Sequence, residues 1–254
     1  NQIRQAPGGG AVLVAAAGNS AAAPSRPANC PGALSVAALN RDGFKATYSS
    51  FGASVAVATV GGDDSDGRWG PLLADSGLLS ITNNGDYAPA SGGYSRGYGT
   101  SFSAPIASGV AALMVSVNPA LSADQIFAGL RFTARPHATS PHLAACSDLN
   151  PGRCACSTST CGLGILDAEQ ATLFAADPQA YVKPAGEGAV LDNDELRSAA
   201  ALGADREPNP GAVAAVSTGG GASTVGWTLA MVAMAGLLLV ASWIQRRVAL
   251  IRAR

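Results

Sequence analysis

The stretch that decides how this chain is interpreted is Gly99-Thr100-Ser101-Phe102-Ser103-Ala104-Pro105. It places Ser101 just after a glycine, at the start of an apolar pattern with helical spacing. Free amide groups at the N-terminus of a helix favour negative charge, which suits an attacking serine oxygen and the oxyanion that its attack produces. The alternative is an ordinary Thr/Ser helix cap. The stretch alone leaves both interpretations open.

The segments around it predict an α/β domain with a parallel sheet. Three short apolar runs, Ala11–Ala17, Leu34–Leu39 and Ser54–Val60, are typical of strands buried on both faces. Apolar residues at helical spacing predict a helix over Ser101–Asn118, which ends before a proline. A second helix is expected to begin at Ser122, because Gln125 completes a capping box three residues later. Strands that alternate with helices indicate a parallel sheet.

A second polar residue stands where the first predicted strand ends. Asn19 follows Ala15-Ala16-Ala17-Gly18. The carboxyl ends of parallel strands border the crevice in which α/β domains bind ligands, so the Asn19 amide is a candidate hydrogen-bond donor to a substrate. The alternative is a turn residue, since asparagine tolerates the left-handed backbone conformation that turns often need.

The two motifs together resemble the subtilisin family of serine peptidases, whose serine motif has the form GTS-x-[SA]-[AS]-P and whose oxyanion asparagine lies in an AAGN turn. The resemblance assigns the nucleophile to Ser101 and the oxyanion donor to Asn19. It extends from Gln2 to about Ala176 and implies a subtilisin-like three-layer fold, here a partial domain. Collinear matches support it: Pro27-Ala28-Asn29-Cys30, Tyr48-Ser49-Ser50-Phe51-Gly52, and the closing Cys161-Gly162-Leu163-Gly164-Ile165-Leu166-Asp167-Ala168.

The same resemblance implies polypeptide substrates and a primary specificity pocket. Small residues would line the pocket: Ala16, Ala17, Gly18, Pro27 and Ala28. Their size suggests a roomy apolar pocket, although the Arg26 side chain could extend into it. No clear motif in the chain predicts a metal-ligating site or a cofactor. Asp63, Asp64 and Asp66 could bind a structural calcium ion, although their spacing is not that of an EF-hand and a solvated loop is the alternative.

The catalytic base that the family requires is not found among the motifs of this chain. The family's triad runs Asp, His, Ser along the chain, so both partners would precede Asn19. The two histidines, His137 and His142, follow Ser101. Without a base a serine hydroxyl is a weak nucleophile, so we expect the chain alone to be inactive and its partner to be an amino-terminal half of the same domain. The opening residues also lack a signal peptide, which favours a fragment of a longer protein. Two alternatives are a non-catalytic, membrane-anchored binding module and one half of a split protein.

Five cysteines suit an oxidising compartment. Four of them lie close together in the sequence: Cys146, Cys154, Cys156 and Cys161. They could form two disulfides, with a pairing that the sequence leaves open, or they could bind a zinc ion. Cys30 is left over, which suggests a partner outside this chain.

The carboxy-terminal part predicts a membrane anchor. Residues 177–224 are rich in Ala, Gly and Pro and are expected to form a linker. Residues 225–245 contain a run without charge that is long enough to cross a bilayer, and residues 246–254 form a basic tail that should stay in the cytoplasm. The peptidase part, residues 1–176, would then lie outside the cytoplasm, in the periplasm or at the cell surface. The glycines at 219–221 leave open a sorting cleavage that releases it. The net charge of −1 gives no reason to expect a nucleic acid partner.

Overall fold

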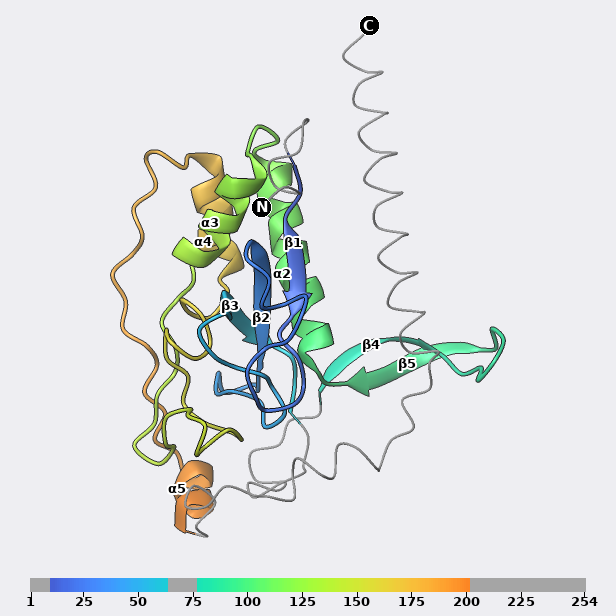
Figure 1. The fold of residues 1–254 in the computed structure, drawn as a ribbon, viewed down its shortest axis with the longest axis vertical. Helices are drawn as coiled ribbons and strands as arrows, with labels where there is room; N and C mark the ends of the chain where they lie inside the picture. Colours follow the sequence, from blue (N-terminus) through green and yellow to red (C-terminus); the bar gives the residue numbers. More distant parts are fainter. Residues whose placement is uncertain (1–9, 64–76, 202–254) are drawn as a thin grey trace, which may run out of the picture. The chain divides into compact units, whose positions relative to one another are not determined.

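The computed structural model describes residues 10–63 and 77–201 and contains a three-stranded parallel sheet (Figure 1). The strands are β1 (Leu13–Ala16), β2 (Ala33–Leu39) and β3 (Val57–Val60), and they lie side by side in that order. β1 pairs with β2 from Leu13 opposite Ala33, and β2 pairs with β3 from Val36 opposite Val57. The three apolar runs are therefore strands, and the α/β class with a parallel sheet is confirmed.

Both faces of the central strand are covered, which explains its uninterrupted apolar sequence. Every residue of β2 is buried. Leu34 and Val36 point into a core shared with the helices, whereas Ala37 and Leu39 point into a second core that contains four cysteines. Successive side chains of a strand face opposite sides of the sheet, so an apolar residue is needed at nearly every position.

Three helices cover the first of these faces. α2 (Thr100–Val117) lies against all three strands, and α3 (Ala123–Phe132) and α4 (Ala168–Ala176) pack against α2 (Figure 1). The predicted capping box is confirmed, because Ser122 Oγ accepts from the Gln125 amide at 3.2 Å and Gln125 Oε1 accepts from the Ser122 amide at 2.9 Å. These bonds satisfy amide groups that a helix leaves unpaired at its start, which sets where α3 begins.

Within the described residues, α2 is the only helix long and apolar enough to cross a membrane. It is the helix that packs on the sheet, and Ala107, Val110 and Met114 are buried there. Its apolar character therefore has an explanation within the domain. The predicted span at 225–245, the basic tail and residues 202–224 of the linker lie outside the described residues.

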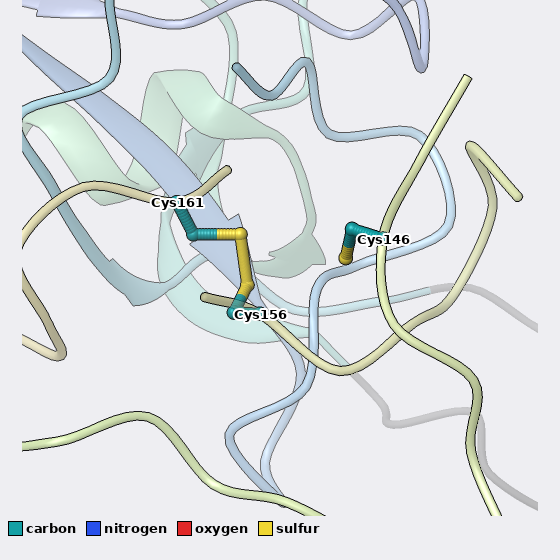
Figure 2. Close-up of side chains that lie close together, drawn as sticks. All are labelled: Cys146, Cys156 and Cys161. Atoms are coloured by element: carbon teal, nitrogen blue, oxygen red, sulfur yellow. A yellow bond between two sulfur atoms is a disulfide. The ribbon is translucent and has the colours of Figure 1, made fainter. Parts of the chain in front are cut away.

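Loops rather than helices cover the second face in the part of the chain that the structure describes. Their cysteines form two disulfides, Cys146–Cys154 and Cys156–Cys161, and Cys30 is unpaired. Figure 2 shows the Cys156–Cys161 bond beside Cys146, whose sulfur lies within 4.8 Å of the other two. Of the two uses predicted for the late cysteines, the structure has the disulfides.

The expected linker differs from the structure over its first part. Parts of residues 177–201 contact the domain: the Thr139 amide donates to the Ala189 carbonyl at 2.9 Å and the Leu191 amide donates to the Thr139 carbonyl at 2.8 Å. The helix α5 (Asp194–Ala201) follows. Leu196 is fully buried in a cluster with Phe44 and Leu143. Two leucines in an otherwise polar, Ala-rich stretch are too few to give a visible periodic pattern, yet both find apolar partners that are distant in sequence.

A hairpin precedes α2. Its strands are β4 (Leu78–Asn83) and β5 (Gly92–Gly97), which form a two-stranded sheet. Asn83 Oδ1 accepts from the Gly85 and Ala90 amides at 2.8 and 3.0 Å and so closes the turn. Residues 81–94 belong to a second compact unit of the chain.

Candidate active site

Asn19 lies at the carboxyl end of β1, where the chain turns at Gly18. Gly18 has a φ of +113°, a conformation that side chains rarely adopt, and a Cβ there would lie 2.9 Å from Ser50 Oγ. Glycine is therefore required at this turn. The turn leaves Asn19 exposed at the end of the sheet.

Thr100 holds the orientation of the Asn19 amide. Asn19 Oδ1 accepts from the Thr100 amide at 3.0 Å and from the Thr100 hydroxyl at 2.8 Å. The Gly18 amide in turn donates to the Thr100 hydroxyl at 3.2 Å. With its oxygen engaged twice, Asn19 has its Nδ2 group left as the donor that can bind an anion. The amide orientation is assigned from these bonds, since oxygen and nitrogen are told apart by their partners.

Ser101 is the second residue of α2 and is exposed. Gly99 is the N-cap, with a φ of +142°, and its carbonyl accepts from the Phe102 amide at 2.9 Å. Thr100, next to Ser101, is fully buried and bonded to Asn19, so the nucleophile candidate and the oxyanion candidate are held together across 81 positions of sequence. The first turn of α2 contains no acidic residue, so no carboxylate of the helix itself offsets the positive end of the helix dipole beside Ser101.

The predicted pocket residues divide into two groups. Ala16, Gly18 and Pro27 are partly or fully exposed. Ala17 and Ala28 are 1% and 2% exposed, because their methyl groups pack in core clusters. Both alanines, main chain included, are therefore almost completely covered by the rest of the domain.

The two histidines have structural contacts of their own. His137 is buried, and its Nε2 lies 3.0 Å from the Gly162 carbonyl; burial lowers the pKa of His137 and this bond partly restores it. His142 Nε2 lies 2.7 Å from Asp192 Oδ1 at the surface. These contacts explain both residues without a catalytic role.

Of the acidic cluster Asp63, Asp64 and Asp66, the structure describes Asp63 and buries it. The prediction of a solvated loop is therefore wrong at Asp63. Asp63 is fully buried and pairs with Arg153, so its carboxylate is occupied by a guanidinium rather than offered to a calcium ion. Asp64 and Asp66 lie outside the described residues.

Comparison with known proteins identifies the family of this chain. The model of the family described as "Subtilase family" matches residues 1–164. The chain belongs to the subtilase family. An extracellular protease of Xanthomonas campestris pv. campestris is 35% identical over 178 residues, which are 69% of this chain and 26% of that protein. An extracellular basic protease of Dichelobacter nodosus is 37% identical over 109 residues, which are 42% of this chain and 16% of that protein.

A solved protease structure from Pseudoalteromonas arctica has the same fold. It is 35% identical, with a TM-score of 0.52, and the match covers 66% of this chain and 43% of that one. This subtilase chain thus spans about a quarter of the length of the Xanthomonas protein and less than half of the solved chain.

The contribution of Thr100 to the candidate site of this subtilase chain was not predicted from the sequence. The sequence interpretation considered Thr100 only as a possible helix cap, whereas the structure buries it and bonds it to both Gly18 and Asn19. The position of Thr100 next to Ser101 in the serine motif was the one feature of the sequence that could have indicated this role.

Proposed function

We propose that the protein containing this chain is a serine endopeptidase in which Ser101 is the nucleophile and Asn19 is an oxyanion-hole donor. Ser101 Oγ would bond to the carbonyl carbon of a substrate as its proton passes to a base. The amine then leaves with a proton, and water releases the acyl group from Ser101. The Asn19 Nδ2 group would donate to the oxyanion in each tetrahedral intermediate.

The observation that carries this proposal is the clamp between Thr100 and Asn19. Both bonds to Asn19 Oδ1 come from the residue adjacent to Ser101. A donor fixed before the reaction requires no reorganisation when charge develops, which is the condition for effective oxyanion stabilisation. An asparagine that acted only as a turn residue would not need this tie to the next motif.

The base and its aspartate would come from a polypeptide outside the described residues, which we take to be the amino-terminal half of the domain. Two exposed surfaces support its docking here. β1 is an outer strand of the described sheet, and Leu13 on it is 38% exposed. The outer face of α2 also carries exposed apolar residues, Leu113, Val115 and Val117, at 42–49%. An unpaired strand edge beside an apolar helix face favours the addition of further strands.

The location of the enzyme follows as a proposal from its relatives and its tail. The two relatives named above are described as extracellular, and the two disulfides suit that compartment. We propose a single-pass membrane protein with the peptidase outside the cytoplasm, held by residues 225–245 or released by cleavage near the glycines at 219–221. Tags at residue 177 and at the carboxyl end, followed in the native host, test this: a single membrane-bound species carrying both tags argues against cleavage.

A fluorophosphonate probe tests the nucleophile. The full-length protein should be labelled, and Ser101→Ala should abolish labelling. Ser108→Ala is the matched control, because Ser108 is an exposed serine on the same helix and bonds only the Ala104 carbonyl. Persistent labelling in Ser101→Ala would assign the reaction to another serine. Residues 1–254 expressed alone should not cleave peptides, and turnover by them would show that a base lies within this chain.

A further inference from the structure

Three charged side chains are buried in loops next to the segments that carry the candidate active site. Lys45 and Asp63 are 0% exposed and Arg153 is 1% exposed. They come from three different loops and take no part in the chemistry proposed above. Burying charge is costly even when the charges are paired, so a cluster of this kind is weak evidence for stability and calls for another explanation.

Asp63 and Arg153 form the centre of the cluster. Arg153 donates from Nε to Asp63 Oδ2 at 2.7 Å and also from Nη2. Thr47 adds its amide at 3.0 Å and its hydroxyl at 3.2 Å. Burial raises the pKa of Asp63, and the Arg153 and Thr47 donors lower it again. The carboxylate thereby joins residue 63 to residue 47 and to the loop that the Cys146–Cys154 disulfide closes.

Lys45 organises the turn that contains Thr47. Its Nζ donates to the carbonyls of Ala46 and Ser49, each at 2.9 Å, and lies 5.2 Å from the centre of the Phe51 ring. The Lys45 amide donates to the Cys154 carbonyl at 3.1 Å, beside Arg153. These contacts of Lys45 Nζ therefore fix the path of residues 45–51, which we call the basal turn.

The basal turn contacts the loop that carries Asn19. The Ser50 amide donates to the Gly18 carbonyl at 2.8 Å, and the Ala21 amide donates to the Tyr48 carbonyl at 2.8 Å. These bonds lie on either side of Asn19 in the chain. A shift of the basal turn would therefore move the oxyanion donor.

The basal turn also contacts the segment behind Ser101. The Tyr48 hydroxyl lies 2.9 Å from the Gly61 carbonyl and 2.6 Å from the Gly62 carbonyl. The Gly61 carbonyl accepts from the Gly99 amide at 2.9 Å, at the N-cap of α2. The segment packs closely here, because a Cβ on Gly61 would lie 2.5 Å from Ser103 Oγ and 2.9 Å from the Gly99 carbonyl.

We propose that Lys45, Asp63 and Arg153 are positioning residues, which hold the basal turn so that Asn19 and Ser101 keep the spacing that the reaction needs. The cluster acts on both halves of the site through hydrogen bonds of the main chain and touches neither the nucleophile nor the substrate. Buried polar groups of this kind specify one geometry at a cost in stability. The predicted effect of the cluster on catalysis rests on the proposed function. Its predicted effect on the segments around Asn19 and Gly99 does not.

The test uses Asp63→Asn in the full-length protein, which keeps the shape of the side chain and removes its charge. Glu195→Gln is the control, since it breaks the exposed ion pair between Arg41 and Glu195. Fluorophosphonate labelling and peptide hydrolysis are measured well below the melting temperature of each variant. Small misplacements of reacting groups are costly, so the labelling rate constant and kcat should fall about ten- to a hundredfold in Asp63→Asn with little change in KM. The control should behave as the unmodified protein does.

Amide hydrogen exchange of residues 18–22 and 98–102 is measured on the same samples. Protection should fall in both segments in Asp63→Asn and stay unchanged in Glu195→Gln. If Asp63→Asn does not fold, Arg153→Lys replaces it, because lysine keeps the charge but cannot form the two-pronged contact. A folded variant with the unmodified labelling rate and unmodified protection overturns the proposal. If the unmodified protein is not labelled at all, the proposed function fails, and the exchange measurement alone decides the positioning role.

Discussion

The substitution Leu196→Ala tests whether residues 177–201 are part of the folded domain. Leu196 is 0% exposed and packs against Phe44, Ala138, Leu143 and Ala155. Truncating a buried leucine to alanine costs about 2–5 kcal/mol, with the cost depending on how far the site can collapse. α5 is only eight residues long, and the charged residues of its first turn are exposed and so hold it only weakly in place. The helix can therefore shift toward the domain and partly fill the cavity left by the smaller side chain. We therefore expect a loss near the lower end, about 2–3 kcal/mol.

Amide hydrogen exchange followed by mass spectrometry measures this loss locally. Peptides covering residues 137–145 and 189–197 should lose protection about thirty- to hundredfold, since each tenfold change corresponds to about 1.4 kcal/mol. Val190→Ala is the matched control: Val190 is 70% exposed in the same segment, and exposed substitutions change stability by only about 0.5 kcal/mol. Protection in Leu196→Ala equal to that of the unmodified protein would refute the packing and return residues 177–201 to the linker.

Burial lowers the pKa of Lys45 from 10.5 to about 7, so between those values the unfolded chain binds more protons than the folded one and stability rises with pH. The free energy of unfolding should rise by ~2 kcal/mol more between pH 7 and pH 9 than it does in Lys45→Met, and equal slopes in unfolding experiments would argue against the lowered pKa of Lys45. Asn19→Ala in the full-length enzyme should lower kcat by about 10²–10³-fold with little change in KM, a magnitude taken from the known loss of the oxyanion donor in subtilisin, and unchanged kcat would remove Asn19 from the mechanism. Mass spectrometry without reduction should find two separate disulfides, Cys146–Cys154 and Cys156–Cys161, and no bound zinc. Stoichiometric zinc with four free thiols would reverse this assignment.

Local signals in the sequence predicted most of the elements that carry the site. The apolar runs at 11–17 and 54–60 contain β1 and β3, and the run at 34–39 covers β2 except for its first residue, Ala33. The capping box at Ser122 marks the start of α3. These features depend on the period of apolar residues and on hydrogen bonds across three or four positions, so a single sequence contains the information. The serine and asparagine motifs are equally local, because each includes the glycine that its turn requires.

Contacts between distant segments were decided only by the tertiary structure. Thr100 reaches Asn19 across 81 positions, and Arg153 reaches Asp63 across 90. The sequence by itself determined the fold class, the family resemblance and the candidate nucleophile, but it left the cysteine pairing open and assigned Asp63 to a solvated loop and Leu196 to a linker. A buried charge or an isolated leucine has no periodic signature, because its partner is set by the path of the whole chain rather than by its neighbours in sequence.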